Sequence, residues 1–122
     1  MNERSIEFYI DDILKSIDKI ETRIAGMSID TFKADEFLMD GVIRNLEIIG
    51  EAAKYVPKET RAKYKELPWK QIIGMRNIAS HGYFKIDPEI VWTIITKDLA
   101  NLKSKAREIK DLLHKNEDNN KS

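Results

Sequence analysis

The chain has 122 residues, no cysteine, and a formal net charge of zero from 21 basic and 21 acidic side chains. This length suits one domain with a single hydrophobic core. The lack of cysteine excludes disulfides and thiolate metal sites, and the first residues lead into an amphipathic segment rather than an apolar leader. No stretch has the length of a membrane span, so we expect a cytoplasmic protein without a membrane segment.

The first half of the chain predicts two long helices. Isoleucines spaced by three and four residues indicate an amphipathic helix that ends near Gly26: Ile6, Ile10, Ile13, Ile17, Ile20 and Ile24. We expect Ser28 or Asp30 to cap a second helix, which Pro57 ends. Its apolar stripe consists of Phe37, Leu38, Val42, Leu46, Ile49, Ala52, Ala53 and Val56.

The second half predicts shorter elements and then a long helix. A brief helix or turn is expected between Pro57 and Pro68, over residues 59–64. The next helix should run from Trp69 to about His81, with an apolar side of Ile72, Ile73 and Ile78, and Gly82 is a plausible stop.

Asp87 should cap the final helix, with Pro88 at its first position. Its apolar stripe is Val91, Ile94, Ile95, Leu99, Leu102, Ala106, Ile109 and Leu113. Short connections and almost no strand signal predict an all-α fold, an antiparallel bundle of four to five helices. We expect this domain to cover residues 1–115, followed by a frayed tail, residues 116–122, that has no apolar side chain.

Charge is unevenly distributed along the chain. Residues 1–53 contain 6 basic and 12 acidic side chains, whereas residues 54–85 contain 8 basic and 2 acidic ones. Tyrosine and tryptophan lie among the lysines of the basic segment, a mixture that suits phosphate contact and base stacking. A solvated helix face has similar counts, so both interpretations stay open. The candidate RNA-binding lysines are Lys63, Lys65, Lys70 and Lys85.

The basic segment also carries the residues that most resemble a catalytic site: Arg76, Asn77, His81 and Tyr83. A guanidinium suits a phosphate, and an imidazole changes protonation near neutral pH, so together they suggest work on a phosphodiester. On a rigid helix Arg76 and His81 do not share a face. Either the helix breaks near Gly82, or two copies of the chain assemble one site across a two-fold axis.

In such a composite site one imidazole would take the proton from a ribose 2′-hydroxyl, while Arg76 stabilises the charge that develops on the phosphate. This chemistry needs no cofactor and no metal, and the run from Met75 to Phe84 offers no carboxylate with which to complete a ligand set around His81. Taken singly, the same residues have simpler roles. His81 would be a polar helix cap, and Trp69, Met75 and Trp92 would fill the core or an interface.

Three motifs together resemble the HEPN domain proteins of the HepT type, over nearly the whole chain. The first is the run from Arg76 to Tyr83, with Trp69 before it and residues 87–92 (Asp-Pro-Glu-Ile-Val-Trp) after it. The second is residues 11–14 (Asp-Asp-Ile-Leu), and the third is residues 44–53 (Arg-Asn-Leu-Glu-Ile-Ile-Gly-Glu-Ala-Ala). The resemblance implies a two-fold homodimer and the toxin of a toxin-antitoxin pair, a metal-independent endoribonuclease that cuts tRNA or mRNA.

The resemblance also assigns roles to residues. Arg76 and His81 would be catalytic, and Asn77 would assist them. A minimal nucleotidyltransferase antitoxin would transfer AMP from ATP to Tyr83 and so block the site with bulk and negative charge. Two alternatives stay open: a non-catalytic helical dimer that binds a nucleotidyltransferase and nucleotide or RNA, and a substrate-presenting subunit of an antibiotic-type nucleotidyltransferase.

Overall fold

The computed structural model describes the backbone of residues 3–78 and 86–121 and the side chains of residues 5–78 and 86–115. Within these ranges all regular structure is helical and no strand occurs, which confirms the all-α prediction. The elements are α1 (Glu3–Ile24), α2 (Ile29–Ala34), α3 (Glu36–Lys54), α4 (Lys58–Lys63), α5 (Trp69–Gly74), the 3₁₀ turn η1 (Met75–Asn77), α6 (Pro88–Thr93), the π-helical segment η3 (Ile94–Asp98) and α7 (Leu99–Lys121).

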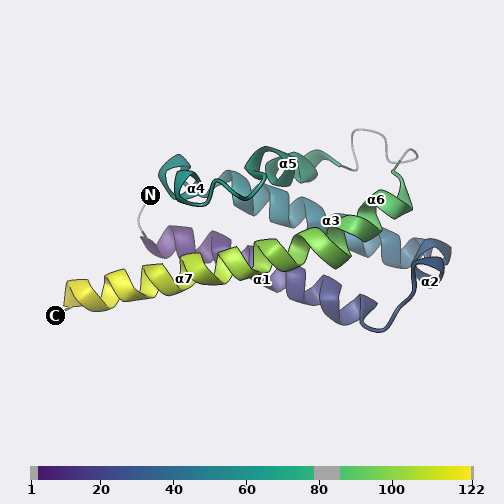
Figure 1. The fold of residues 1–122 in the computed structure, drawn as a ribbon, viewed down its shortest axis with the longest axis horizontal. Helices are drawn as coiled ribbons and strands as arrows, with labels where there is room; N and C mark the ends of the chain where they lie inside the picture. The colour runs from purple at the N-terminus through teal and green to yellow at the C-terminus, as the bar shows by residue number, and fades with distance from the viewer. Residues whose placement is uncertain (1–2, 79–85, 122) are drawn as a thin grey trace.

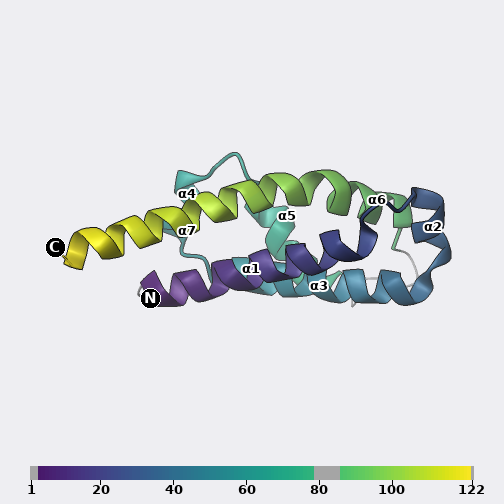
Figure 2. The same cartoon turned by 90° about the horizontal axis from the view of Figure 1, so that it is seen from below.

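Three long helices form the body of the molecule. α1 lies beside both α3 and α7 and runs antiparallel to both (Figures 1 and 2). The six isoleucines of the predicted first stripe are all buried, as are seven of the eight apolar residues expected for the final helix. The exception is Ile94, which is half-buried. The amphipathic stripes therefore face a common core, as the periodicity predicts.

Ion pairs join α7 to α1 along the rim of this core. Lys110 lies 2.7 Å from Asp11, and Lys103 lies 2.6 Å from Glu21. The carboxylate of Asp11 raises the pKa of Lys110. Since all four side chains are partly exposed, these pairs orient the two helices more than they stabilise them.

The second predicted helix is interrupted. Ser28 caps α2, as expected, but α2 ends at Ala34, and the Asp35 carboxylate accepts a hydrogen bond from the backbone N–H of Leu38 at 2.9 Å to start α3. The break also corrects the predicted stripe. Phe37 is 91% exposed, and Phe32, which the stripe omitted, is fully buried against Trp92 with a ring distance of 5.2 Å.

The helix predicted from Trp69 to His81 is shorter in the structure. Its α-helical part ends at Gly74, and the chain tightens into η1, where the Ile78 N–H donates to the Met75 carbonyl at 3.1 Å. His81 and Gly82 lie outside the described residues. The brief helix predicted within residues 59–64 is present as α4, one residue earlier.

The final helix begins as predicted. The Asp87 carboxylate accepts from the Glu89 N–H at 2.9 Å, and Pro88 occupies the first turn. The segment η3 joins α6 to α7, which extends to Lys121 and so through most of the predicted tail. The division into residues 1–115 and 116–122 stays a prediction.

No helix among the described residues combines enough length with enough apolar character to cross a lipid bilayer.

Candidate functional site

The position of Arg76 depends on how closely η1 approaches α3. Gly50, near the C-terminal end of α3, meets this turn through its backbone: a Cβ atom placed on Gly50 would lie 2.5 Å from the Arg76 backbone nitrogen and 2.9 Å from the Ile72 carbonyl oxygen. Both distances are too short for any side chain. Glycine at position 50 therefore lets the backbone of Arg76 rest directly on α3.

The side chain of Arg76 is half-buried and lines a cleft of about 270 Å³ between η1, α1 and α3, called here the Arg76 cleft. The other lining residues are Tyr9, Asp12, Arg44, Glu47, Ile48, Glu51, Ala52 and Tyr55. The rings of Tyr9 and Tyr55 stack at 5.0 Å with 17° between their planes. These two rings join α1 to the end of α3 beside the arginines.

The Arg76 cleft contains two guanidinium groups and three carboxylates. Among the described residues, no ion pair or hydrogen bond joins any of these five side chains to a partner. Charged groups that lose part of their hydration are stabilised when an opposite charge comes close. The cleft is thus chemically suited to an anion at the arginines and to a cation, or a basic partner surface, at the carboxylates.

The structure places only some of the predicted site residues. Arg76 faces the cleft, and Asn77 is exposed in the same turn. The predicted catalytic His81, the predicted modified Tyr83 and the RNA-binding candidate Lys85 lie outside the described residues. The convergence of Arg76 with His81 therefore stays a prediction.

The other candidate lysines are all exposed, but they do not share one site. Lys63 ends α4, and Lys70 lies in α5. Lys65 lines a separate groove of about 410 Å³, formed by Lys58, Arg61, Ala62, Lys65, Leu67 and Trp69. We call this the α4–α5 groove.

Several residues of the Arg76 cleft were not assigned to the site by the sequence reasoning. The sequence indicated three of its lining residues, Arg44, Glu47 and Glu51, only as part of a motif, together with Gly50, which supports the cleft from α3. It did not indicate Tyr9 at all. One signal was present: glycine inside an apolar helical pattern, followed by Ala52 and Ala53, is typical of close packing between backbones. Nothing local indicates that Tyr9 and Tyr55, 46 positions apart, stack on each other.

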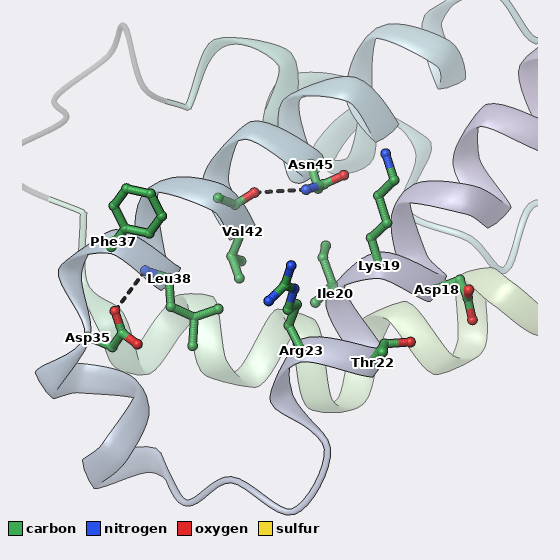
Figure 3. Close-up of a pocket in the computed structure, with 11 residues that line it drawn as sticks. Asp18, Lys19, Ile20, Thr22, Arg23, Asp35, Phe37, Leu38, Val42 and Asn45 are labelled. Carbon is green, nitrogen blue, oxygen red and sulfur yellow. Dashed lines mark hydrogen bonds between the residues drawn. The ribbon is translucent and has the colours of Figure 1, made fainter.

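A second, larger groove of about 710 Å³ lies at the other end of the α1–α3 pair (Figure 3). Asp18, Lys19 and Arg23 line it from α1, and Asn45 lines it from α3, where its amide nitrogen donates to the Gly41 carbonyl at 2.9 Å. This groove contains none of the predicted catalytic residues. We therefore place the candidate site at the Arg76 cleft.

Within residues 5–78 and 86–115, no group of three or more histidine, aspartate or glutamate side chains is arranged to hold a metal ion.

Comparison with known proteins agrees with the family resemblance that the three sequence motifs carry. The family model described as "Ribonuclease HepT-like" matches residues 13–109. A Methanocaldococcus jannaschii protein named "Gamma-glutamylcyclotransferase and putative RNase" is 40% identical over 95% of this chain, but the chain spans only 52% of that relative. No solved structure matches the chain significantly.

Two relatives of similar length are matched almost completely. A Caldanaerobacter subterraneus subsp. tengcongensis protein named "Putative RNase" is 40% identical over 83% of this chain and 90% of its own length. "Probable ribonuclease HepT" of Thermococcus cleftensis is 33% identical over 88% of this chain and 98% of its own length. With the family model matching most of its residues, this chain belongs to the HepT-like ribonuclease family.

Proposed function

We propose that this chain is the toxin of a toxin-antitoxin pair, a metal-independent endoribonuclease whose active site forms between two copies of the chain. The observation that carries the proposal is the placement of Arg76. Its backbone rests on Gly50, its side chain lines a cleft, and in the sequence Asn77 follows it directly and His81 stands five positions later. Membership of the HepT-like ribonuclease family supports RNA as the substrate.

In the proposed reaction, neutral His81 accepts the proton of a ribose 2′-hydroxyl. The 2′-oxygen then attacks the adjacent phosphorus, the bond to the 5′-oxygen breaks, and the leaving oxygen takes a proton from a second, protonated imidazole. Arg76 stabilises the negative charge that develops on the phosphate oxygens, and Asn77 assists by hydrogen bonding. The products are a 2′,3′-cyclic phosphate and a 5′-hydroxyl.

The second imidazole is the reason for proposing a homodimer. One chain supplies one His81, whereas two chains related by a two-fold axis supply an acid and a base to one cleft. Among the described residues, the charged side chains of the Arg76 cleft have no ion-pair partner, which supports this arrangement: Arg44 of one copy and Glu51 of another have opposite signs, and both residues line the cleft. An isologous interface brings such groups together twice.

The proposed antitoxin is a minimal nucleotidyltransferase. It would transfer AMP from ATP to the phenolic oxygen of Tyr83, with pyrophosphate as the leaving group. The added phosphate would oppose the negative charge of RNA at the site and occupy the space that the substrate needs. Intact-mass analysis of wild type and Tyr83→Phe after incubation with the partner and ATP tests this step, because only the wild type should gain the mass of AMP.

Cleavage of total cellular RNA in excess EDTA, by wild type and by His81→Ala, tests the nuclease itself. We expect wild type alone to cut and to leave cyclic phosphate ends. Full activity in His81→Ala would refute the mechanism. RNA binding that His81→Ala retains, with no cleavage by unmodified wild type, would instead favour a non-catalytic dimer that binds a nucleotidyltransferase.

A further inference from the structure

The Arg76 cleft by itself is a poor attractor of RNA. Its two arginines are accompanied by Asp12, Glu47 and Glu51, so carboxylates outnumber guanidiniums around the proposed reaction centre. Phosphate contacts supply most of the affinity for nucleic acid, and each of these carboxylates repels a phosphate. A substrate held at this cleft therefore needs cationic contacts at another place on the protein.

The α4–α5 groove has the missing charge. Lys58, Arg61 and Lys65 line it together with Trp69, and no carboxylate is among its lining residues. Within the described part of the chain none of these three cations forms an ion pair. The groove thus differs from the Arg76 cleft in presenting one sign of charge.

Two side chains of the groove are held in place by the backbone. The Arg61 Nε donates to the Val56 carbonyl at 3.0 Å, which leaves its two terminal nitrogens for a phosphate. The Trp69 Nε1 donates to the Tyr64 carbonyl at 3.0 Å and fixes the plane of a half-buried ring. Groups that are already ordered lose little conformational entropy when a ligand binds.

The acidic side chains of this region do not cancel the charge of the groove. The Glu66 carboxylate lies 3.2 Å from Lys105 on α7. A hydrogen bond from its own backbone amide lowers the pKa of Glu66 most, and the ion pair with Lys105 lowers this pKa further. Glu66 is therefore an anion, and its negative charge is paired with Lys105. Glu59 is exposed on α4 and does not line the groove.

We propose that the α4–α5 groove is an RNA-docking subsite, separate from the reaction centre, in which Lys58, Arg61 and Lys65 bind backbone phosphates and a base packs on Trp69. This inference rests on the proposed function, because it takes RNA as the ligand. Base stacking on a fixed aromatic ring beside a cationic surface is the common mode of sequence-tolerant binding to single strands.

The subsite lies close to the reaction centre along the chain. Tyr55 lines the Arg76 cleft, and Lys58, three residues later, lines the groove. Three residues span at most about 11 Å between Cα atoms. The groove is thus within reach of an RNA strand whose scissile bond lies at Arg76.

The double variant Lys58→Gln/Lys65→Gln tests the subsite. Its matched control is Lys15→Gln/Lys115→Gln, which removes the same charge from two exposed lysines on α1 and α7 that have no ion pair among the described residues. The probe is a fluorescently labelled single strand of about 12 nucleotides with 2′-O-methyl groups throughout, because it cannot be cleaved. Its dissociation constant is measured by anisotropy over a range of salt concentrations.

We expect the groove variant to bind about 25-fold more weakly than wild type near 0.1 M salt, and its slope of log K against log salt to fall by about 1.4, from two lost contacts at about 0.7 each. The control should keep the wild-type slope. Equal losses in both variants, or no loss in either, would overturn the proposal.

The cleavage assay separates this result from the proposed function. Cleavage by wild type, with unchanged binding in the groove variant, would overturn only the subsite. No cleavage by wild type, with the predicted loss of binding in the groove variant alone, would support the subsite and overturn the nuclease. In an active protein we expect the groove variant to raise KM for RNA and to leave kcat within about twofold of wild type.

Discussion

Gly50 lies in α3 with its Cα against the backbone of the turn that carries Arg76, so this position leaves no room for a side chain. A methyl group at position 50 would push against the Arg76 nitrogen and the carbonyl oxygens of Ile72 and Ile73, at 2.5, 2.9 and 3.1 Å. All three atoms belong to the backbone and cannot rotate away. Any substitution must therefore move η1, and the guanidinium with it.

We expect Gly50→Ala to lower the free energy of unfolding by about 1–3 kcal/mol, the usual cost of inserting a methyl group into a packed contact. Displacement of Arg76 should lower kcat/KM for RNA by about 10- to 100-fold. Thermal denaturation and cleavage assays measure the two effects. Gly41→Ala is the control, because nothing lies within 4 Å of a Cβ at position 41 of the same helix. Wild-type values for Gly50→Ala would contradict this account.

At this scale the sequence predicted part of the site. It indicated Arg76 and Asn77 from residue type and spacing alone, and the structure places Arg76 in a cleft. It could not predict which side chains share that cleft with Arg76, because Asp12 of α1 and Glu47 of α3 meet it only through the packing of separate elements. Residues on separate helices carry no shared local pattern.

Helix boundaries show where local signals compete. The sequence offered Ser28 and Asp30 as starts for one long helix, and the structure uses Ser28 for α2 and Asp35 for α3. The interruption turns the chain so that Phe32 can pack on Trp92. Tertiary burial of one aromatic side chain thus outweighs the continuity of a helix, and periodicity alone does not reveal that balance.

The Asp35 cap can be tested directly. Its carboxylate accepts from the Leu38 N–H at 2.9 Å, so Asp35→Ala should lower the free energy of unfolding by about 1 kcal/mol, measured by urea denaturation. Asp35→Asn is the matched control and should retain most of that stability, because asparagine is an equally good cap. Equal losses in the two variants would mean that the negative charge of Asp35, and not its hydrogen bond to the Leu38 N–H, stabilises the helix.

For the long helices the sequence was a reliable guide. The stripes of α1 and α7 were predicted almost residue by residue, because both helices bury one continuous face, from Ile6 to Ile24 and from Leu99 to Leu113, within the residues whose side chains the structure describes. The end of α5 was not predicted: the close contact with Gly50 holds residues 72–76, and the change to a 3₁₀ turn occurs within that contact.

For the whole molecule, we expect the free energy of unfolding to fall at alkaline pH because of Tyr64. Burial raises the pKa of Tyr64 above 10.0, so the unfolded chain releases the phenolic proton at a lower pH than the folded chain does. The contribution of the protonated Tyr64 phenol to the free energy of unfolding is complete below about pH 10. It is lost as pH rises through the higher pKa of Tyr64 in the folded chain.

Tyr64→Phe removes this dependence. Between about pH 9 and about pH 11, the free energy of unfolding of Tyr64→Phe should therefore fall less steeply than that of wild type. The lysine ion pairs, including that of Lys105 with its raised pKa, are present in both proteins, so the difference between the two curves reports the phenol of Tyr64 and its interactions. Parallel curves from chemical denaturation would show that Tyr64 has no such role.

The proposed two-chain site makes a further prediction at the scale of the assembly. A mixed dimer of one wild-type chain and one His81→Ala chain, purified by a different tag on each chain, should cleave RNA at least about 100-fold more slowly than the wild-type homodimer, because its cleft contains only one of the two imidazoles. A site built within one chain would leave the mixed dimer with about half of the wild-type activity. Size-exclusion chromatography with light scattering checks that the mixed species is a dimer.

The π-helical segment η3 has a consequence for the length of the chain. Across this segment the buried residues Val91, Ile95 and Leu99 are each four positions apart. Beyond it the spacing between buried residues alternates between three and four positions. A π turn accommodates one residue more than an α turn. Loss of one exposed residue from η3, such as Thr96, would therefore convert it to an α-helix while the faces of α6 and α7 keep their direction. Natural length variation in this helix, where it occurs, should concentrate at this segment.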